Sequence, residues 1–258
     1  MPQHLLSDAL EQAERSEPVV RAAALLHIAR VLNAFDHAEA ERVLDRGIAL
    51  AGDLAEPDRE VILSEAVSLA ATVSPDRAIR LASSVRYEMR GVPGRGPMSK
   101  ALSDMLSHGY VADAVQYLSD PPSVQDYPFD AALHAIGRSK DDGTRLRILR
   151  AAISAVRRQS SSGQADTLFK GSGWFSRMFV RWWRLLPADE GTEVVRDLVR
   201  RILAQPDGPI RASVQDVRFS STREHCLFEI LEPLQRLDPD LAGSLIREYP
   251  QLAAAAAH

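Results

Sequence analysis

The segment 22–50 sets a pattern that the rest of the chain repeats. Apolar and small side chains recur in it every three or four residues, first over residues 24–32 and again over residues 40–48. Each run predicts a helix with one apolar stripe, and the polar residues between the runs predict a turn. A single helical hairpin cannot bury both of its stripes, so this segment must pack against further helices.

Five more hairpins of the same kind follow along the chain. The intervals between the starts of successive second helices are 38, 36, 33, 44 and 51 residues. This recurrence predicts an all-α protein, an α-solenoid of about six stacked antiparallel helical hairpins. The six predicted starts lie near Asp36, Ser74, Tyr110, Gly143, Pro187 and Asp238.

Two of these starts share a clear signal. Ser74 and Asp238 each precede a Pro and then an Asp, which places a capping side chain, a proline at the first helical position and an acid in the first turn. Pro233 is expected to kink the helix that carries it. The alternation within residues 210–221 is too brief to predict a strand, and we expect this segment to be irregular. Residues 249–258 are expected to form a frayed helix or to be disordered.

The spacing of the hairpins resembles that of known α-solenoids. Tetratricopeptide repeats are about 34 residues long and HEAT repeats about 40 to 47, and the resemblance covers nearly the whole chain. It identifies a class of architecture, HEAT-like or tetratricopeptide-like, rather than one family. The resemblance implies a curved array whose concave face binds other proteins.

One segment interrupts the helical pattern strongly. Residues 159–173 are rich in Ser, Gly and Gln, a composition typical of linkers. We expect a linker or long loop here, between helical repeats over residues 1–158 and over residues 174–258. The alternative is one continuous array.

Composition narrows the class of protein further. Hydrophobic residues make up 45% and charged residues 26%, which is ordinary for a folded domain. The single cysteine, Cys226, excludes an intramolecular disulfide, and no zinc-ligand spacing occurs. We therefore predict no metal and no cofactor. The sequence shows neither a secretory leader nor an apolar run of membrane-spanning length, which favours a cytoplasmic location without a membrane span. The oligomeric state stays open.

The charge is distributed unevenly. Although the net charge is −4, residues 1–130 carry a net −8 and residues 131–258 a net +4. Residues 138–184 hold 11 basic and only 3 acidic side chains. If these cations share a face, they favour an anionic partner.

The tryptophans lie within this basic segment. A helix over residues 174–186 would place Trp174 and three arginines on one face, with arginines of the preceding helix nearby if the hairpins stack. Such a surface can hold phosphates, stack on bases or contact anionic protein motifs. The predicted binding residues are Arg150, Arg157, Arg158, Trp174, Arg177, Arg181 and Arg184.

Three functions fit these observations. The first is a non-catalytic scaffold whose partner is another protein, since the chain shows helical repeats and no catalytic motif. The second is binding of nucleic acid or another polyanion by the basic segment. The third follows from a likeness to alkylpurine DNA glycosylases of HEAT-like architecture, which have a similar length and a basic, tryptophan-bearing concave face. The chain departs from those enzymes because no acid stands near Trp182 and Trp183; the nearest, Asp189, opens the next helix.

Overall fold

The protein is almost entirely helical. The computed structural model describes residues 2–85, 96–121, 127–159, 174–204, 207–214 and 217–256. Within these ranges the only sheet is one two-stranded hairpin, so the prediction of an all-α protein is confirmed. Two compact units share the chain, unit 1 (Met1–Leu118) and unit 2 (Ser119–His258).

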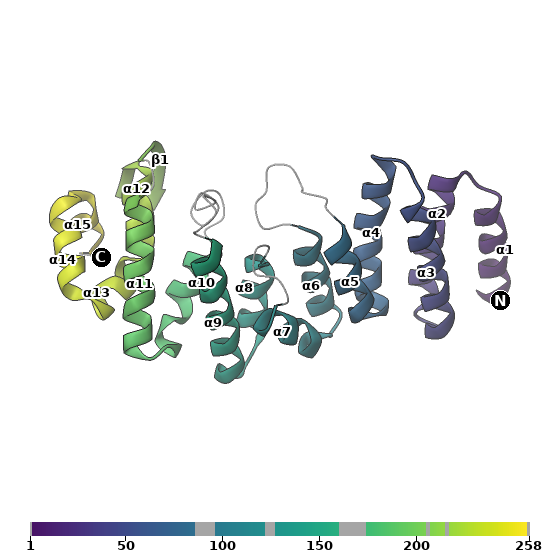
Figure 1. The fold of residues 1–258 in the computed structure, drawn as a ribbon, viewed down its shortest axis with the longest axis horizontal. Helices are drawn as coiled ribbons and strands as arrows, with labels where there is room; N and C mark the ends of the chain where they lie inside the picture. The colour runs from purple at the N-terminus through teal and green to yellow at the C-terminus, as the bar shows by residue number, and fades with distance from the viewer. Residues whose placement is uncertain are drawn as a thin grey trace. The chain divides into compact units, whose positions relative to one another are not determined.

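Unit 1 is made of consecutive helices joined by short connections (Figure 1). They are α1 (Pro2–Glu14), α2 (Pro18–Leu32), α3 (His37–Gly52), α4 (Asp58–Val73), α5 (Pro75–Ser84), α6 (Pro97–Ser107) and α7 (Val111–Ser119). Helix α2 packs on α3 and α4, and α4 packs on α5 and α6. The first helix of each hairpin therefore contacts the first helix of the next. The apolar stripes supply the core, in which Leu25, Leu26, Leu44, Leu102 and Met105 are fully buried.

A pair of hydrogen bonds fixes the register of these first helices. The carbonyl oxygen of Thr72, in the last turn of α4, accepts from Asn33 Nδ2 at 2.9 Å and from the Tyr110 hydroxyl at 3.4 Å. Asn33 follows α2 directly, and Tyr110 follows α6. The three residues are separated by 39 and 38 positions. Residues at or near the turns of three successive hairpins are thus joined at one end of the helices.

Ion pairs connect the second helices in a similar way. Arg46 of α3 pairs with Glu14 of α1, and Arg77 of α5 pairs with Asp45 of α3 at 2.9 Å. Both pairs span 32 positions. Because at least one side chain of each pair is more than half exposed, each pair adds only about 0–1 kcal/mol of stability. The equal spacing of the two pairs shows that the same contact between helices occurs twice in unit 1.

Two of the predicted helix starts have a side-chain cap, and a third does not. Asp36 caps α3 by accepting from the Glu39 N–H at 3.0 Å, and Asp238 accepts from the Leu241 N–H at 3.1 Å. Ser74 occupies the N-cap position of α5, but its side chain makes no cap hydrogen bond. Gly109, between α6 and α7, has a φ of +92°, a conformation that favours glycine because it lacks a Cβ.

Unit 2 contains the remaining helices and the sheet (Figure 1). Its helices are α8 (Phe129–Arg138), α9 (Asp142–Gln159), α10 (Trp174–Trp182), the 3₁₀ turn η3 (Trp183–Leu185), α11 (Ala188–Ala204), α12 (Thr222–Glu229), α13 (Leu231–Leu237), α14 (Pro239–Glu248) and α15 (Pro250–Ala256). Its strands are β1 (Pro209–Val214) and β2 (Val217–Ser221). The break between α12 and α13 falls at Ile230, just before Pro233, as its proline predicts. Residues 250–256 form a helix, so the alternative of disorder is wrong for them.

A row of aromatic rings joins α8 to α10. Tyr127 lies 5.0 Å from Phe129, Phe129 lies 6.0 Å from Phe175, and Phe175 lies 6.3 Å from Phe179, measured between ring centroids. Edge-to-face and offset contacts of this kind add to the energy of apolar burial. Helix α10 also packs on α9. The predicted linker lies almost wholly outside the described residues, from 160 to 173, and the domain boundary there stays a prediction.

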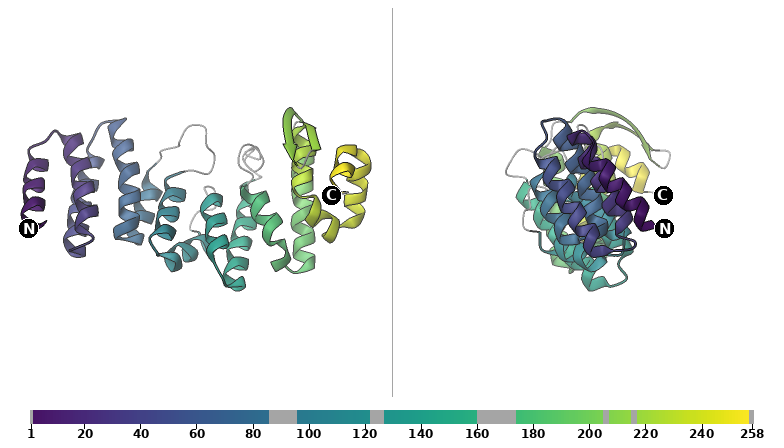
Figure 2. Two further views of the ribbon diagram at one scale, coloured as in Figure 1. Left: turned by 180° about the vertical axis from the view of Figure 1, so that it is seen from behind. Right: turned by 90° about the vertical axis from the view of Figure 1, so that its right-hand side faces the viewer.

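The expectation of irregular structure over residues 210–221 is wrong. Strands β1 and β2 pair antiparallel and pack on α12 (Figure 2). Phe219 is buried against His225 and Phe228, with ring centroids 5.6 and 5.0 Å apart. The strands are five and six residues long, so the alternation is short, and the burial that stabilises it comes from α12.

Candidate functional site

Helix α9 carries the most arginines of the basic segment on its exposed side. Its buried side includes Ile148, Leu149 and Ala152, as the helical period requires. Asp141 begins the helix by accepting from the Thr144 N–H at 2.7 Å. Hydrogen bonds from Thr144 and Gly143 hold the pKa of Asp141 below its usual value. The helix start is therefore fixed by its own first turn.

Two of the predicted residues on α9 are paired with acids of α11. The guanidinium of Arg150 donates from Nε to Glu190 Oε1 at 3.0 Å and from Nη2 to Oε2 at 2.6 Å. This bidentate contact raises the pKa of Arg150. Arg157 lies 3.6 Å from Glu193. The acids of α11 thus neutralise part of the basic segment.

Two arginines, one on α10 and one on η3, lie against tryptophans. The guanidinium carbon of Arg181 is 4.9 Å from the ring centroid of Trp182, and that of Arg184 is 4.8 Å from Trp183. Arg184 also contacts Glu232 of α13 at 2.6 Å. These tryptophans therefore hold cations of their own chain, by cation–π attraction.

The predicted helix over residues 174–186 ends earlier than expected. Helix α10 stops at Trp182, and Arg184 lies on η3. Arg177 and Arg181 are exposed on α10. The structure describes the backbone of Trp174 but not its side chain. The predicted set therefore occupies three elements, and the acids of α11 and α13 lie among its arginines.

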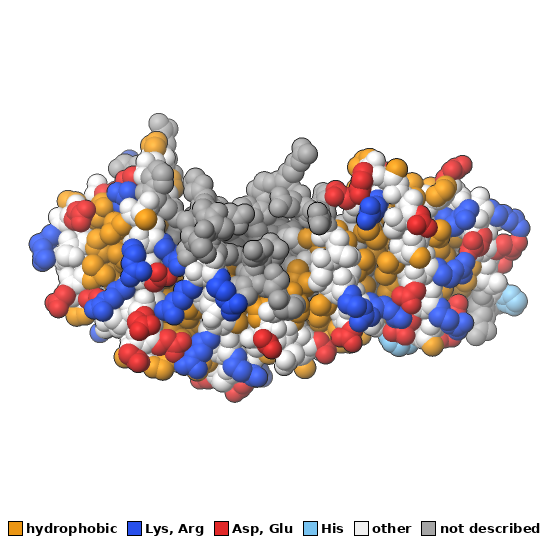
Figure 3. All heavy atoms as spheres, in the orientation of Figure 1, with side chains coloured by type: hydrophobic (Ala, Val, Ile, Leu, Met, Phe, Trp, Pro, Cys, Tyr) orange, Lys and Arg blue, Asp and Glu red, His pale blue; other side chains and the backbone are white. Residues whose placement is uncertain are grey.

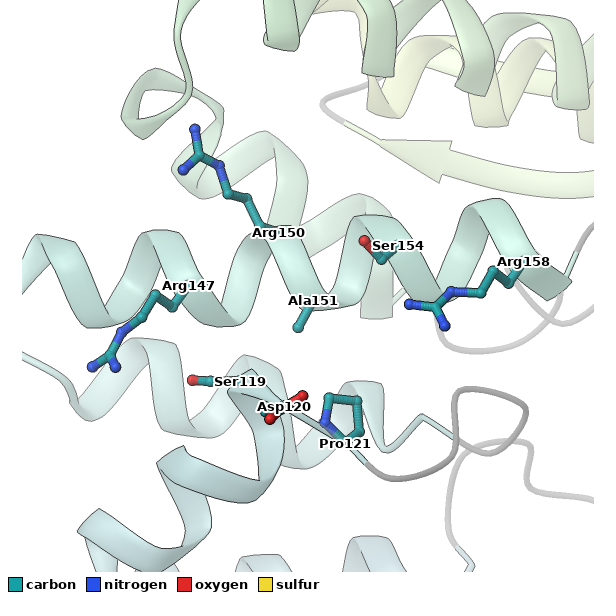
Figure 4. Close-up of a pocket in the computed structure, with 8 residues that line it drawn as sticks. All are labelled: Ser119, Asp120, Pro121, Arg147, Arg150, Ala151, Ser154 and Arg158. Atoms are coloured by element: carbon teal, nitrogen blue, oxygen red, sulfur yellow. The ribbon is translucent and has the colours of Figure 1, made fainter.

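A groove along the exposed side of α9 was not predicted. It has a volume of about 420 Å³. Figure 4 shows Arg147 and Arg158 on the same helix, with Ala151 between them, facing the segment 119–121. The described residues that line it are Arg147, Arg150, Ala151, Ser154 and Arg158 from α9, and Ser119, Asp120 and Pro121 from the start of unit 2.

The charges in this groove are arranged unevenly. Arg147 contacts the Thr144 hydroxyl at 3.2 Å, a neutral partner that leaves its charge in place. Asp120 supplies a negative charge on the opposite wall. The hydroxyl oxygen of Ser119 is buried and has no hydrogen-bond partner among the described residues. A buried, unpaired hydroxyl costs free energy.

Sequence reasoning named Arg150 and Arg158 but not the rest of the groove. Residues 147, 151, 154 and 158 recur at helical spacing, a signal that the sequence does contain. The contribution of residues 119–121 has no such signal, because it depends on a contact between distant parts of the chain. Over the face of unit 2 seen in Figure 3, basic and acidic side chains alternate.

Other reactive groups in the described residues have structural explanations. Cys226 is buried, and burial raises the pKa of its thiol to about 12. Asp207 accepts from the Ser221 hydroxyl at 2.7 Å and so has a lowered pKa, whereas burial raises the pKa of Glu224. By accepting from Ser221 of β2 and from the Arg223 N–H of α12, Asp207 connects the β-hairpin to the start of α12. No three His, Cys, Asp or Glu side chains among the described residues are grouped to hold a metal ion.

Helix length and polarity also bear on the membrane. In the described part of the chain, no helix combines the length and apolar character that crossing a membrane requires.

Comparison of the chain with protein-family models, with curated proteins and with solved structures finds no match. Function is therefore inferred from the arrangement of its side chains.

Proposed function

We propose that the protein is a non-catalytic α-solenoid of about six antiparallel helical hairpins that serves as a scaffold for another protein. The observation that carries this proposal is the repeated contact in unit 1, where the Thr72 carbonyl accepts from Asn33 and Tyr110, residues near the turns of the neighbouring hairpins. Repeats of this kind expose a long surface relative to their mass, because each one packs mainly on its neighbours. Such surfaces suit extended partners.

The electrostatics of unit 2 favour a protein partner over nucleic acid. Arg150, Arg157 and Arg184 each lie within 4 Å of a carboxylate oxygen. Binding to a phosphate backbone would require these arginines to exchange their acids for phosphates. Nucleic-acid surfaces also rely on unobstructed cations and on stacking aromatics, whereas Trp182 and Trp183 already carry arginines of the same chain.

The test is recovery of a direct protein partner. The full chain is immobilised, exposed to nuclease-treated lysate of its native host, and the retained proteins are identified by mass spectrometry. Each candidate is then purified and titrated against the chain by calorimetry. We expect at least one candidate to bind with a 1:1 or other fixed ratio. Retention of nucleic acid alone in untreated lysate, with no purified protein binding, would overturn the proposal.

A further inference from the structure

We propose that the groove between α9 and the segment 119–121 binds an extended segment of a partner protein that is acidic at both ends and neutral or basic at its centre. This inference rests on the proposed scaffold function and names the chemistry of the partner. Four features of the groove support it: the spacing of two arginines, the position of Asp120, the hydroxyl of Ser154 and the absence of aromatic side chains among the described residues of its lining.

The spacing of the arginines sets the length of the bound segment. Arg147 and Arg158 are eleven positions apart on α9, which corresponds to about 16 Å along a helix. An extended chain advances about 3.3 Å per residue, so about five residues span the same distance. Carboxylates about five residues apart can therefore meet both guanidinium groups, each by a charge-assisted hydrogen bond.

The centre of the groove has a different character. Asp120 lies on the wall opposite Ala151, between the two arginines (Figure 4). A carboxylate at this point repels a continuous run of negative charge and attracts a basic or hydrogen-bond-donating group. The alternation of positive, negative and positive side chains thus selects for the opposite alternation in the ligand.

The walls suit a peptide backbone. The exposed Ser154 hydroxyl can donate to a peptide carbonyl, and Ala151 and Pro121 add apolar surface to the walls. None of the described residues that line the groove is aromatic, so these residues offer a base no stacking partner. This combination favours an acidic peptide over single-stranded nucleic acid.

The binding test uses defined probes. The first is a fluorescent seven-residue peptide with two Glu at each end and a central Lys flanked by Ala. The second is its isomer with all four Glu contiguous, and the third is heptaglutamate. Anisotropy titrations of the full chain at low salt should show the first peptide binding at least threefold more tightly than either other peptide. Equal or weaker binding of the first peptide would overturn the inference.

Two variants locate the site. R147Q combined with R158Q should weaken binding of the first peptide about tenfold, or about 1.4 kcal/mol, because it removes two partly exposed ion pairs. R200Q combined with R236Q removes the same charge from exposed positions of unit 2 outside the groove and should leave affinity unchanged. D120N should raise the affinity for heptaglutamate severalfold. Equal losses in both double variants would show that net charge alone acts, and would overturn the inference.

Competing ligands decide between chemical classes. Inorganic phosphate, a phosphoserine peptide and a single-stranded oligonucleotide are titrated as competitors of the first peptide. Displacement by any of them at lower concentration than unlabelled first peptide would overturn the inference. The same two double variants are then used with the partner recovered from the host. Equal binding of that partner to both variants would overturn the groove proposal and leave the scaffold function intact. Absence of any direct partner would overturn the scaffold function, and with it the assignment of the groove to a partner protein, whatever the peptides show.

Discussion

Removing the Asp238 side chain should destabilise unit 2 in a graded way. This carboxylate is buried, caps α14 through the Leu241 N–H at 3.1 Å, and accepts from Arg196 Nε at 2.6 Å. Loss of an N-cap costs about 1 kcal/mol. Because the Arg196 side chain is 58% exposed, its pair with Asp238 adds only about 0.5 kcal/mol. D238A should therefore lower the free energy of unfolding by about 1.5 kcal/mol.

Two further variants separate the cap from the ion pair. In D238N the amide oxygen can still accept at the helix start, so this variant should lose only about 0.5 kcal/mol. R196A should lose a similar amount, since it removes the ion pair and keeps the cap. All three tryptophans lie in unit 2. Urea unfolding followed by tryptophan fluorescence therefore reports the unit that contains Asp238.

The pH dependence supplies a second measurement. Hydrogen bonding to Arg196, followed by that to Leu241, lowers the pKa of Asp238 in the folded state. A carboxyl with a lowered folded pKa adds stability above its unfolded pKa, and this stability is lost as the pH falls through the folded value. The stability difference between the wild type and D238N should therefore shrink on acidification from about pH 5 to pH 3. Equal losses in D238N and D238A at pH 7, or a difference that grows on acidification, would refute this account.

Three other predictions concern both units. G47V should lower the stability of unit 1 by about 1–3 kcal/mol, because a Cβ at Gly47 would lie 2.9 Å from Leu26 Cδ2. The stability is measured by circular dichroism during urea unfolding, and a value equal to that of the wild type would contradict the close packing of α2 on α3. N33A should cost about 1 kcal/mol in the same assay, since Thr72 loses its shorter hydrogen bond, and an unchanged midpoint would argue against that contact. Cys226, buried and with its pKa raised to about 12, should react with a thiol reagent at pH 8 only in denaturant; rapid labelling of the native protein would contradict its burial.

Local signals explain how much of the fold the sequence predicts. The predicted second-helix starts at Asp36, Ser74 and Tyr110 each lie one residue before the helix that forms. Caps and prolines act within one turn, so their effect can be seen in a short stretch of sequence. The β-hairpin over residues 209–221 depends instead on burial of Phe219 against α12. Because contacts with α12 stabilise this strand pairing, the sequence of the two strands shows only a short alternation of apolar and polar residues.

The sequence likewise predicts those features of the candidate site that lie within one helix, but not those that depend on contacts between distant segments. The spacing of arginines on α9 is a property of one helix, and the sequence shows it directly. The ion pair between Arg150 and Glu190 spans 40 positions, and the wall formed by Asp120 faces Arg147 from another segment. Contacts of this range depend on how helices pack, which the periodicity of each helix does not specify. The chain therefore reveals its cations but not which of them are neutralised.

The shared acceptor at Thr72 has a consequence for how this protein can change. Since the oxygen that receives Asn33 and Tyr110 belongs to the main chain, replacing the threonine by another residue that continues the helix keeps the acceptor in place. Inserting one residue within α4 would instead turn that oxygen by about 100° around the helix axis. Over evolution, position 72 is therefore free to vary in identity, while the length of the helix that contains it is constrained.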